Sequence, residues 1–218
     1  AHRVRLSGLH GGHSGIDIHL QRGNAVQLLA RMLHAIAPGT PGFLAEIQGG
    51  NKHNAIPREA FATVVIPDDQ SGAFLRQMDA QFQEIRDEYR SVEPGMAMEI
   101  TDTALPAKVW STDSTWKALR LLVALPHGVV AMSNDIPGLV ETSTNLAVVK
   151  TNGARLHILT SSRSSVASAL QWIRRKIRAI GFLASAEVEE HDGYPGWKPD
   201  LDSEVLKIVK SVHARVLG

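Results

Sequence analysis

The chain has 218 residues, of which 44% are hydrophobic and 21% charged, with ten histidines and no cysteine. This composition is that of a folded globular chain with a sizeable core, and the lack of cysteine excludes disulfides, cysteine-ligated zinc, iron–sulfur clusters and a thiol nucleophile. The 23 basic and 22 acidic side chains give a net charge of +1; no basic stripe suggests a nucleic acid, and no apolar run suggests a membrane partner.

The first hundred residues show hydrophobic periodicities that alternate between strand and helix. Asn24 is suited to cap the first helix, whose apolar positions recur from residue 25 to 36, and Pro38-Gly39 follows it. The predicted order is strand 3–9, a helix from Asn24, strand 43–47, strand 61–66, a helix from Ser71 to Pro94, and strand 96–101. This β-α-β-β-α-β order is the split βαβ pattern of a ferredoxin-like sandwich.

The second half repeats most of this rhythm as α-β-β-α-β. The predicted elements are helix 112–125, strands 146–150 and 156–160 joined by a turn at 151–153, a helix that starts at Ser164 or Ser165, and strand 184–189. We therefore expect an α+β fold: a two-layer sandwich with a largely antiparallel sheet and helices on one face.

The two ends of the chain suggest a piece of a longer polypeptide. The sequence starts at Ala1 without an initiator Met, and the stiff connector Gly193–Pro199 precedes a last predicted helix from Asp202 or Ser203. The apolar positions of this helix have no predicted strand left on which to pack. We expect a domain boundary after Asp192, with residues 1–192 on one side and 193–218 on the other.

The densest polar feature is the run Gly8–Gly15, which contains His10 and His13 and lies near His2 and His19. Three interpretations are open: a histidine metal site, a turn whose glycines supply positive φ with solvated histidines, or an imidazole that donates a proton or hydrogen bond to a bound substrate. The spacing alone does not decide among them.

Serine and carboxylate chemistry find little support in the sequence. Ser14 lacks the G-x-S-x-G spacing of a nucleophile elbow, and Ser114-Thr115-Trp116-Lys117 matches S-x-x-K without its companion motifs. The acidic cluster Glu189–Asp192 is interpreted as a solvated exit from the sheet. Apart from Glu189-Glu190 in this cluster, the chain contains no Glu-Glu pair, and it contains no H-x-D motif of the kind that holds catalytic metals.

Two further segments each allow a structural and a functional interpretation. Residues 49–59 form an ordinary loop between strands, or a polar crest where Asn54 offers its amide to a ligand. Residues 160–165 are expected between a strand and a helix N-terminus. There Arg163 is either solvated or aimed at a carboxylate, which suits its planar guanidinium.

Three segments together resemble one family. Gly8–Gly15, followed by Asp17-Ile18-His19 and Gly23-Asn24-Ala25, is similar to the lid-domain entry of the bacterial aminoacyl-histidine (Xaa-His, carnosine-type) dipeptidases. Asn54–Ala62 resembles the next block of that family. Gly193–Pro199 resembles the return from the lid to the catalytic domain. The order and spacing of the blocks also agree, and the resemblance covers essentially the whole chain.

The resemblance implies a two-domain metallopeptidase whose catalytic domain binds two zinc ions, with none of the zinc ligands in this chain. Residues 1–192 then correspond to the lid or dimerisation domain, and 193–218 to the linker and first helix back into the catalytic domain. The position that matches the carbonyl-polarising histidine is His13. Asn54 and Arg163 match the residues that hold the substrate's C-terminal carboxylate, Arg163 by position rather than by motif. His10 departs from the expected pattern.

The resemblance thus predicts part of a cytoplasmic, homodimeric zinc dipeptidase for Xaa-His substrates such as carnosine, inactive when isolated. The alternative is a free-standing ferredoxin-like module that dimerises or binds a small ligand without catalysis. A histidine–metal site at His10, His13 and His19 is the third possibility.

Overall fold

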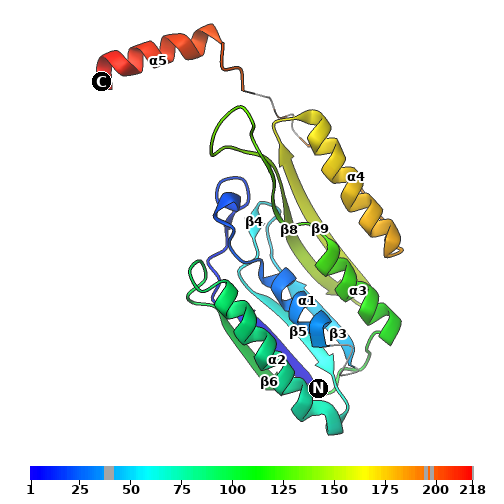
Figure 1. Cartoon of the computed structure of the whole chain (residues 1–218). Coiled ribbons are helices and arrows are strands. Elements are labelled where there is room, and N and C mark those ends of the chain that lie inside the picture. Colours follow the sequence, from blue (N-terminus) through cyan, green and yellow to red (C-terminus); the bar gives the residue numbers. More distant parts are fainter. Residues whose placement is uncertain (37–41, 194–195, 197–198, 218) are drawn as a thin grey trace.

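The computed structural model describes residues 1–36, 42–193, 196 and 199–217. The predicted helix end at Pro38-Gly39 and most of the connector Gly193–Pro199 fall outside these residues. Within them, one seven-stranded antiparallel sheet carries helices α1 to α4 on one face (Figure 1). The predicted two-layer α+β sandwich is confirmed.

The N-terminal half forms the predicted ferredoxin-like unit. Its elements are β1 (His2–Ser7), α1 (Ala25–Ile36), β3 (Phe43–Gly49), β5 (Ala60–Val65), α2 (Asp68–Glu88) and β6 (Ala97–Asp102). The strands lie in the order β6-β1-β5-β3, which places β1 and β5 at the centre of this unit. Each split βαβ half thus contributes one inner strand and one outer strand.

The second half extends the same sheet. Its elements are α3 (Thr112–Ala124), β7 (Gly128–Met132), β8 (Val140–Asn152), β9 (Arg155–Ser164) and α4 (Ala167–Leu183). Strand β8 joins β3 through Gly49 and Val149, and it pairs with β9 through the predicted hairpin. Its turn contains Gly153 at φ +59°. Sequence periodicity missed β7, whose residues are half-buried or exposed.

The predicted last strand at 184–189 is wrong. After α4 the backbone turns back, with Ser185 at φ +57° and the amide of Ala186 donating to the carbonyl of Gly181. Glu190 then pairs with Arg174 and Arg178 on α4. These contacts hold the segment along its own helix and away from the sheet.

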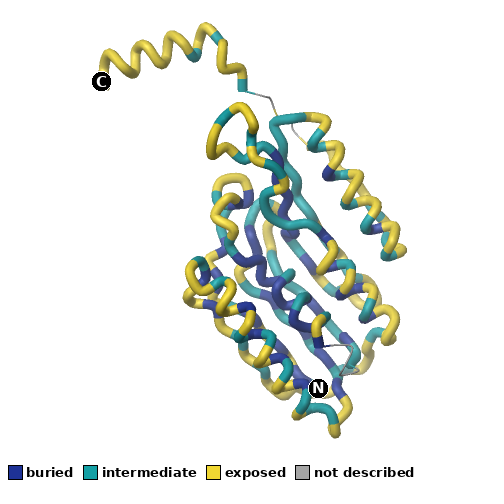
Figure 2. The backbone as a smooth tube through the Cα atoms, in the orientation of Figure 1, coloured by how far each residue is buried: buried dark blue, intermediate teal, exposed yellow. Residues whose placement is uncertain are grey.

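The core lies between the sheet and its helices, and α1 is its central element. Asn24 caps α1 as predicted, because its Oδ1 accepts from the amides of Val26 and Gln27. Eight of the twelve α1 residues are buried, against α2 on one side and α3 on the other (Figures 1 and 2). Helix α2 buries the predicted stripe of Phe74, Met78, Phe82 and Ile85.

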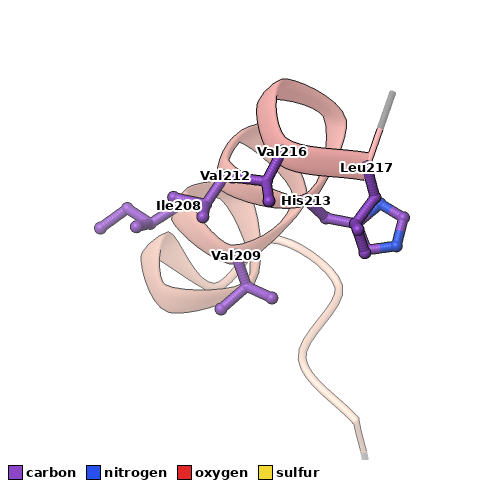
Figure 3. Close-up of a pocket in the computed structure, with 6 residues that line it drawn as sticks. All are labelled: Ile208, Val209, Val212, His213, Val216 and Leu217. Carbon is purple, nitrogen blue, oxygen red and sulfur yellow. The ribbon is translucent and has the colours of Figure 1, made fainter.

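Helix α5 (Glu204–Leu217) extends away from the sandwich, and none of its residues is buried (Figures 1 and 2). Apolar side chains line a shallow hollow on its surface, as Figure 3 shows: Ile208, Val209, Val212, Val216 and Leu217, beside His213. Leu217 is 74% exposed. Among the described residues, no helix has the length and apolarity needed to cross a membrane.

Candidate functional site

A two-stranded ribbon brings the glycine-rich segment and the Asn54 loop together at one end of the sheet. It consists of β2 (Gly12–His13) and β4 (Ala55–Ile56), with His13 opposite Ala55. The amide of Ser14 donates to the carbonyl of Asn54 at 2.8 Å. His13 on β2 therefore lies beside the turn that holds Asn54, immediately before β4, although 41 positions separate the two residues in the sequence.

Arg163 approaches the same place from the second half of the sheet. It lies within β9, opposite Ser143 of β8, so its predicted position between a strand and a helix is wrong. The strand continues to Ser164 because the N-terminal part of β8 extends the ladder, and α4 begins only at Ala167.

Gly15 is the point where Arg163 and His13 meet. A Cβ atom built on Gly15 would lie 2.9 Å from Nη1 of Arg163 and 3.1 Å from Cε1 of His13. Any larger residue would compete for this space. The structure thus brings His13 and Arg163 together at Gly15, and the main-chain bond from Ser14 to Asn54 places the third predicted residue in the adjoining loop.

The His13 main chain is fixed by a local turn. Its amide donates to Oδ2 of Asp17 at 2.8 Å, and its carbonyl accepts from the amide of Asp17, also at 2.8 Å. Gly12, at φ +139°, leaves room for this carboxylate, since a Cβ there would lie 2.7 Å from Oδ2 of Asp17. The glycines of this segment therefore serve both backbone geometry and close packing.

The imidazole of His13 is oriented by its neighbour. The amide of Gly15 donates to Nδ1 of His13 at 3.1 Å. An Nδ1 atom that accepts a hydrogen bond carries no proton, so the neutral ring bears its proton on Nε2. His13 thus offers an N–H donor at Nε2, which suits an oxygen that gains negative charge.

A buried carboxylate that sequence reasoning missed anchors the base of the glycine-rich segment. The Glu93 side chain is fully buried and accepts from the amide of His10 at 2.7 Å, from Nδ1 of His10 at 2.9 Å and from the amide of Gly23 at 2.9 Å. His10 therefore has a structural partner. A lone Glu after a helix carries no sequence pattern that would reveal this role.

Asn24 and His127 form a second polar pair that the sequence did not indicate. Nδ2 of Asn24 donates to the carbonyl of Leu146 at 2.8 Å and lies 3.2 Å from Nδ1 of His127. Burial lowers the pKa of His127 from its usual 6.5 to about 4. At neutral pH its ring is therefore uncharged and able to accept this hydrogen bond.

The described residues contain no group of three or more His, Asp or Glu side chains placed to hold a metal ion. His10 is engaged by Glu93, and His19 lies on the short 3-10 helix η1 (Ile18–Leu20). His2 contacts Ser71 through Nε2 at 2.8 Å. The described histidines and carboxylates therefore do not fit a zinc ion.

The site can recognise a negatively charged or strongly polarised group. The His13 imidazole, the Asn54 amide and the Arg163 guanidinium all donate hydrogen bonds and come from three separate segments. Such donors bind carboxylates and stabilise oxyanions. Each of the three residues is partly exposed, so a ligand from solvent can reach them.

Comparisons with known proteins found a family model that matches part of the chain and relatives that match along its whole length. Residues 4–93 match the model of the peptidase dimerisation domain, of the M20 type. The chain is 35% identical over 217 residues to the cytosol non-specific dipeptidase of Escherichia coli K12, covering 99% of this chain and 44% of that protein. It superposes on the aminoacylhistidine dipeptidase of Vibrio alginolyticus with a TM-score of 0.96 at 34% identity. That match covers 100% of this chain and 44% of the other, so the chain spans less than half the length of either relative.

Proposed function

Because this chain carries a peptidase dimerisation domain and is similar along its whole length to dipeptidases, we propose that it forms the lid of a zinc dipeptidase. The substrates are Xaa-His dipeptides such as carnosine. The observation that carries the proposal is the convergence of His13 and Arg163 at Gly15, beside the ribbon that holds Asn54. Two donors that meet at Gly15, with a third residue in the adjoining loop, suit a short peptide with a free carboxylate.

Each residue has its own role in this proposal. His13 donates from Nε2 to the scissile carbonyl oxygen, which gains charge as the peptide bond is attacked. Asn54 and Arg163 bind the C-terminal carboxylate of the dipeptide. The removal of one oxyanion donor costs on the order of 100-fold or more in rate. Closure of the lid over the substrate also excludes water, which strengthens each of these hydrogen bonds.

The metal belongs to the remainder of the enzyme in this proposal. Residues of a catalytic domain outside this chain would hold two zinc ions, which would supply an activated water there, and residues 1–192 supply only substrate contacts. Residues 193–218 form the linker and first helix of that domain. The exposed apolar stripe of α5 supports this division, because such a stripe gains stability only when another surface covers it.

The same relatives support a proposal for the oligomeric state and for the cellular compartment. The match to a dimerisation domain supports a homodimer, and the similarity to the cytosol non-specific dipeptidase of Escherichia coli supports a cytoplasmic enzyme. Sedimentation of the full-length protein tests the first point: we expect a dimer, and a monomer at micromolar concentration would contradict it.

The activity is tested by comparing two polypeptides with carnosine and zinc. The full-length polypeptide that contains this chain should hydrolyse carnosine, and the 218-residue chain should show no turnover. Turnover by the 218-residue chain at a normal dipeptidase rate would contradict the proposal that the catalytic domain lies outside this chain. A full-length protein inactive on carnosine and on other Xaa-His dipeptides would contradict the substrate class and favour a non-catalytic ligand-binding module.

A further inference from the structure

Asn145 is a buried side chain whose amide nitrogen faces the loop that carries Asn54. It lies on β8, is 1% exposed, and donates from Nδ2 to the carbonyl of Ala55 at 2.8 Å. The same Nδ2 lies 3.5 Å from the carbonyl of His53. The two acceptors flank Asn54, so one amide group holds the backbone on both sides of that residue.

The carbonyl of Asn54 itself is held by a different segment. It accepts from the amide of Ser14, the residue after His13, at 2.8 Å. Three consecutive carbonyls, at residues 53, 54 and 55, thus all face donors from elsewhere in the fold. A loop whose main chain is fixed at three successive peptide groups has little freedom to reorient its side chains.

The strand register links Asn145 to Arg163. Asn145 pairs with Ser161 of β9, and Ser143 pairs with Arg163. Residues two apart on a strand project from the same face, so Asn145 and Arg163 are diagonal neighbours on one face of the hairpin. The same face of the β8–β9 hairpin therefore carries Arg163, which reaches the site, and Asn145, which hydrogen-bonds the Asn54 loop.

We propose that Asn145 is a positioning residue that sets the orientation of Asn54 relative to Arg163 in the substrate site. The inference rests on the proposed function, since it gives Asn54 a substrate to bind. Asn145 does not touch the substrate itself. Because it acts through Asn54, its removal affects catalysis only while Asn54 is present.

The test is a double-mutant cycle in the full-length polypeptide, with carnosine as the probe. We expect Asn145→Ala to lower kcat/KM about tenfold, mainly through KM, because the carboxylate contact is made in both ground and transition states. In the Asn54→Ala background, Asn145→Ala should change kcat/KM by less than about twofold. Effects that multiply, or an Asn145→Ala enzyme with wild-type kcat/KM beside an impaired Asn54→Ala enzyme, would overturn the proposal.

Thr144→Val is the matched control. Thr144 is equally buried on the same strand, and its Oγ1 lies 2.9 Å from Oγ of Ser162, so the variant loses a buried hydrogen bond away from the Asn54 loop. It should keep wild-type KM. Asn145→Ser serves as a milder second variant if Asn145→Ala does not fold, with the same dependence on Asn54.

Amide hydrogen exchange of the 218-residue chain separates this proposal from the dipeptidase function. Asn145→Ala should speed exchange of the Ser14 amide at least tenfold and leave α2 unchanged, whereas Thr144→Val should not. Unchanged Ser14 exchange in Asn145→Ala would overturn the positioning role. If Asn54→Ala retains full activity, the proposed function of Asn54 fails, and the exchange measurement still decides whether Asn145 holds the loop.

Discussion

The imidazole of His13 and the guanidinium of Arg163 approach the same point in space, the position that a Cβ atom would occupy on Gly15. The two side chains lie 150 positions apart in the sequence and come from separate strands, β2 and β9. Gly15 also donates its amide to Nδ1 of His13. One small residue therefore both orients the imidazole and admits the arginine beside it.

A methyl group at Gly15 should disturb this arrangement. Gly15→Ala introduces contacts of 2.9 Å and 3.1 Å with Arg163 and His13, so one or both side chains must move. We expect kcat/KM of the full-length enzyme for carnosine to fall 10- to 100-fold, since displacement by about 1 Å can cost on the order of 100-fold.

Gly72→Ala is the matched control for this variant. Gly72 lies in α2, where the nearest atom to an added Cβ is Nη1 of Arg76 at 3.5 Å. That exchange should leave activity unchanged and stabilise the helix by up to about 1 kcal/mol. Equal activity of both variants would contradict the steric role of Gly15.

Removal of the Glu93 carboxylate should destabilise the fold. Glu93→Ala leaves the buried amide of Gly23 without its acceptor and removes two contacts of His10. We expect a loss of about 3 kcal/mol in the free energy of unfolding, measured with urea on the 218-residue chain.

Glu99→Ala on the exposed strand β6 provides the comparison for Glu93→Ala. Glu99 is solvent-exposed, and its replacement should change stability by no more than about 0.5 kcal/mol. A Glu93→Ala protein as stable as Glu99→Ala would show that the buried carboxylate is not the anchor of the glycine-rich segment.

Stability should fall as the pH drops below neutrality, in part because of His127. Its pKa is lowered by burial to about 4, so between pH 6.5 and 4 the unfolded chain binds a proton that the folded chain does not. Linkage then reduces stability with falling pH, by about 2 kcal/mol between pH 7 and 4.5 for this group.

The contribution of His127 is isolated by replacing it. Urea unfolding of His127→Gln should show a decrease in the free energy of unfolding between pH 7 and 4.5. This decrease should be smaller than that of the wild-type chain by about 2 kcal/mol. Identical pH dependence of the two proteins would mean that His127 is not held neutral in the fold.

The apolar side chains of helix α5 should contribute to stability only in the complete enzyme. Val212→Ser removes an apolar side chain from the exposed stripe and should leave the unfolding of the 218-residue chain unchanged, because nothing buried is lost. In the full-length protein the same change should cost about 1 to 2 kcal/mol, as for loss of a buried valine side chain. Equal, negligible effects in both proteins would argue that no surface covers this helix.

Much of the sandwich was predictable from the sequence because its elements are long and periodic. Helix α2 shows its buried face through Phe74, Met78 and Phe82, and the Asn24 cap marks the start of α1. The strand prediction for residues 184–189 is wrong. Their alternating pattern suits a strand, but the ion pairs of Glu190 hold the chain along α4. Such tertiary contacts leave no local pattern.

The candidate site residues could be proposed from the sequence, but the way in which the fold places them could not. His13 and Asn54 lie in segments that the sequence marks as unusual, but the two-residue strands β2 and β4 that join these segments are too short to show periodicity. Arg163 was placed in a loop because its serine-rich surroundings suit a helix cap, and the long partner strand β8 holds it in the ladder instead. The supporting residues Glu93 and Asn145 act through single buried hydrogen-bonding groups, which only the folded chain reveals.

The most direct test of the proposed role of this chain is the activity of His13→Ala in the full-length polypeptide, with His19→Ala as the control. His19 lies six residues away, is exposed and belongs to η1. We predict that His13→Ala lowers kcat for carnosine about 100-fold or more, as for loss of an oxyanion donor, and that His19→Ala stays within about twofold of wild type. Wild-type kcat in His13→Ala would contradict the central claim that this chain supplies a substrate-polarising imidazole.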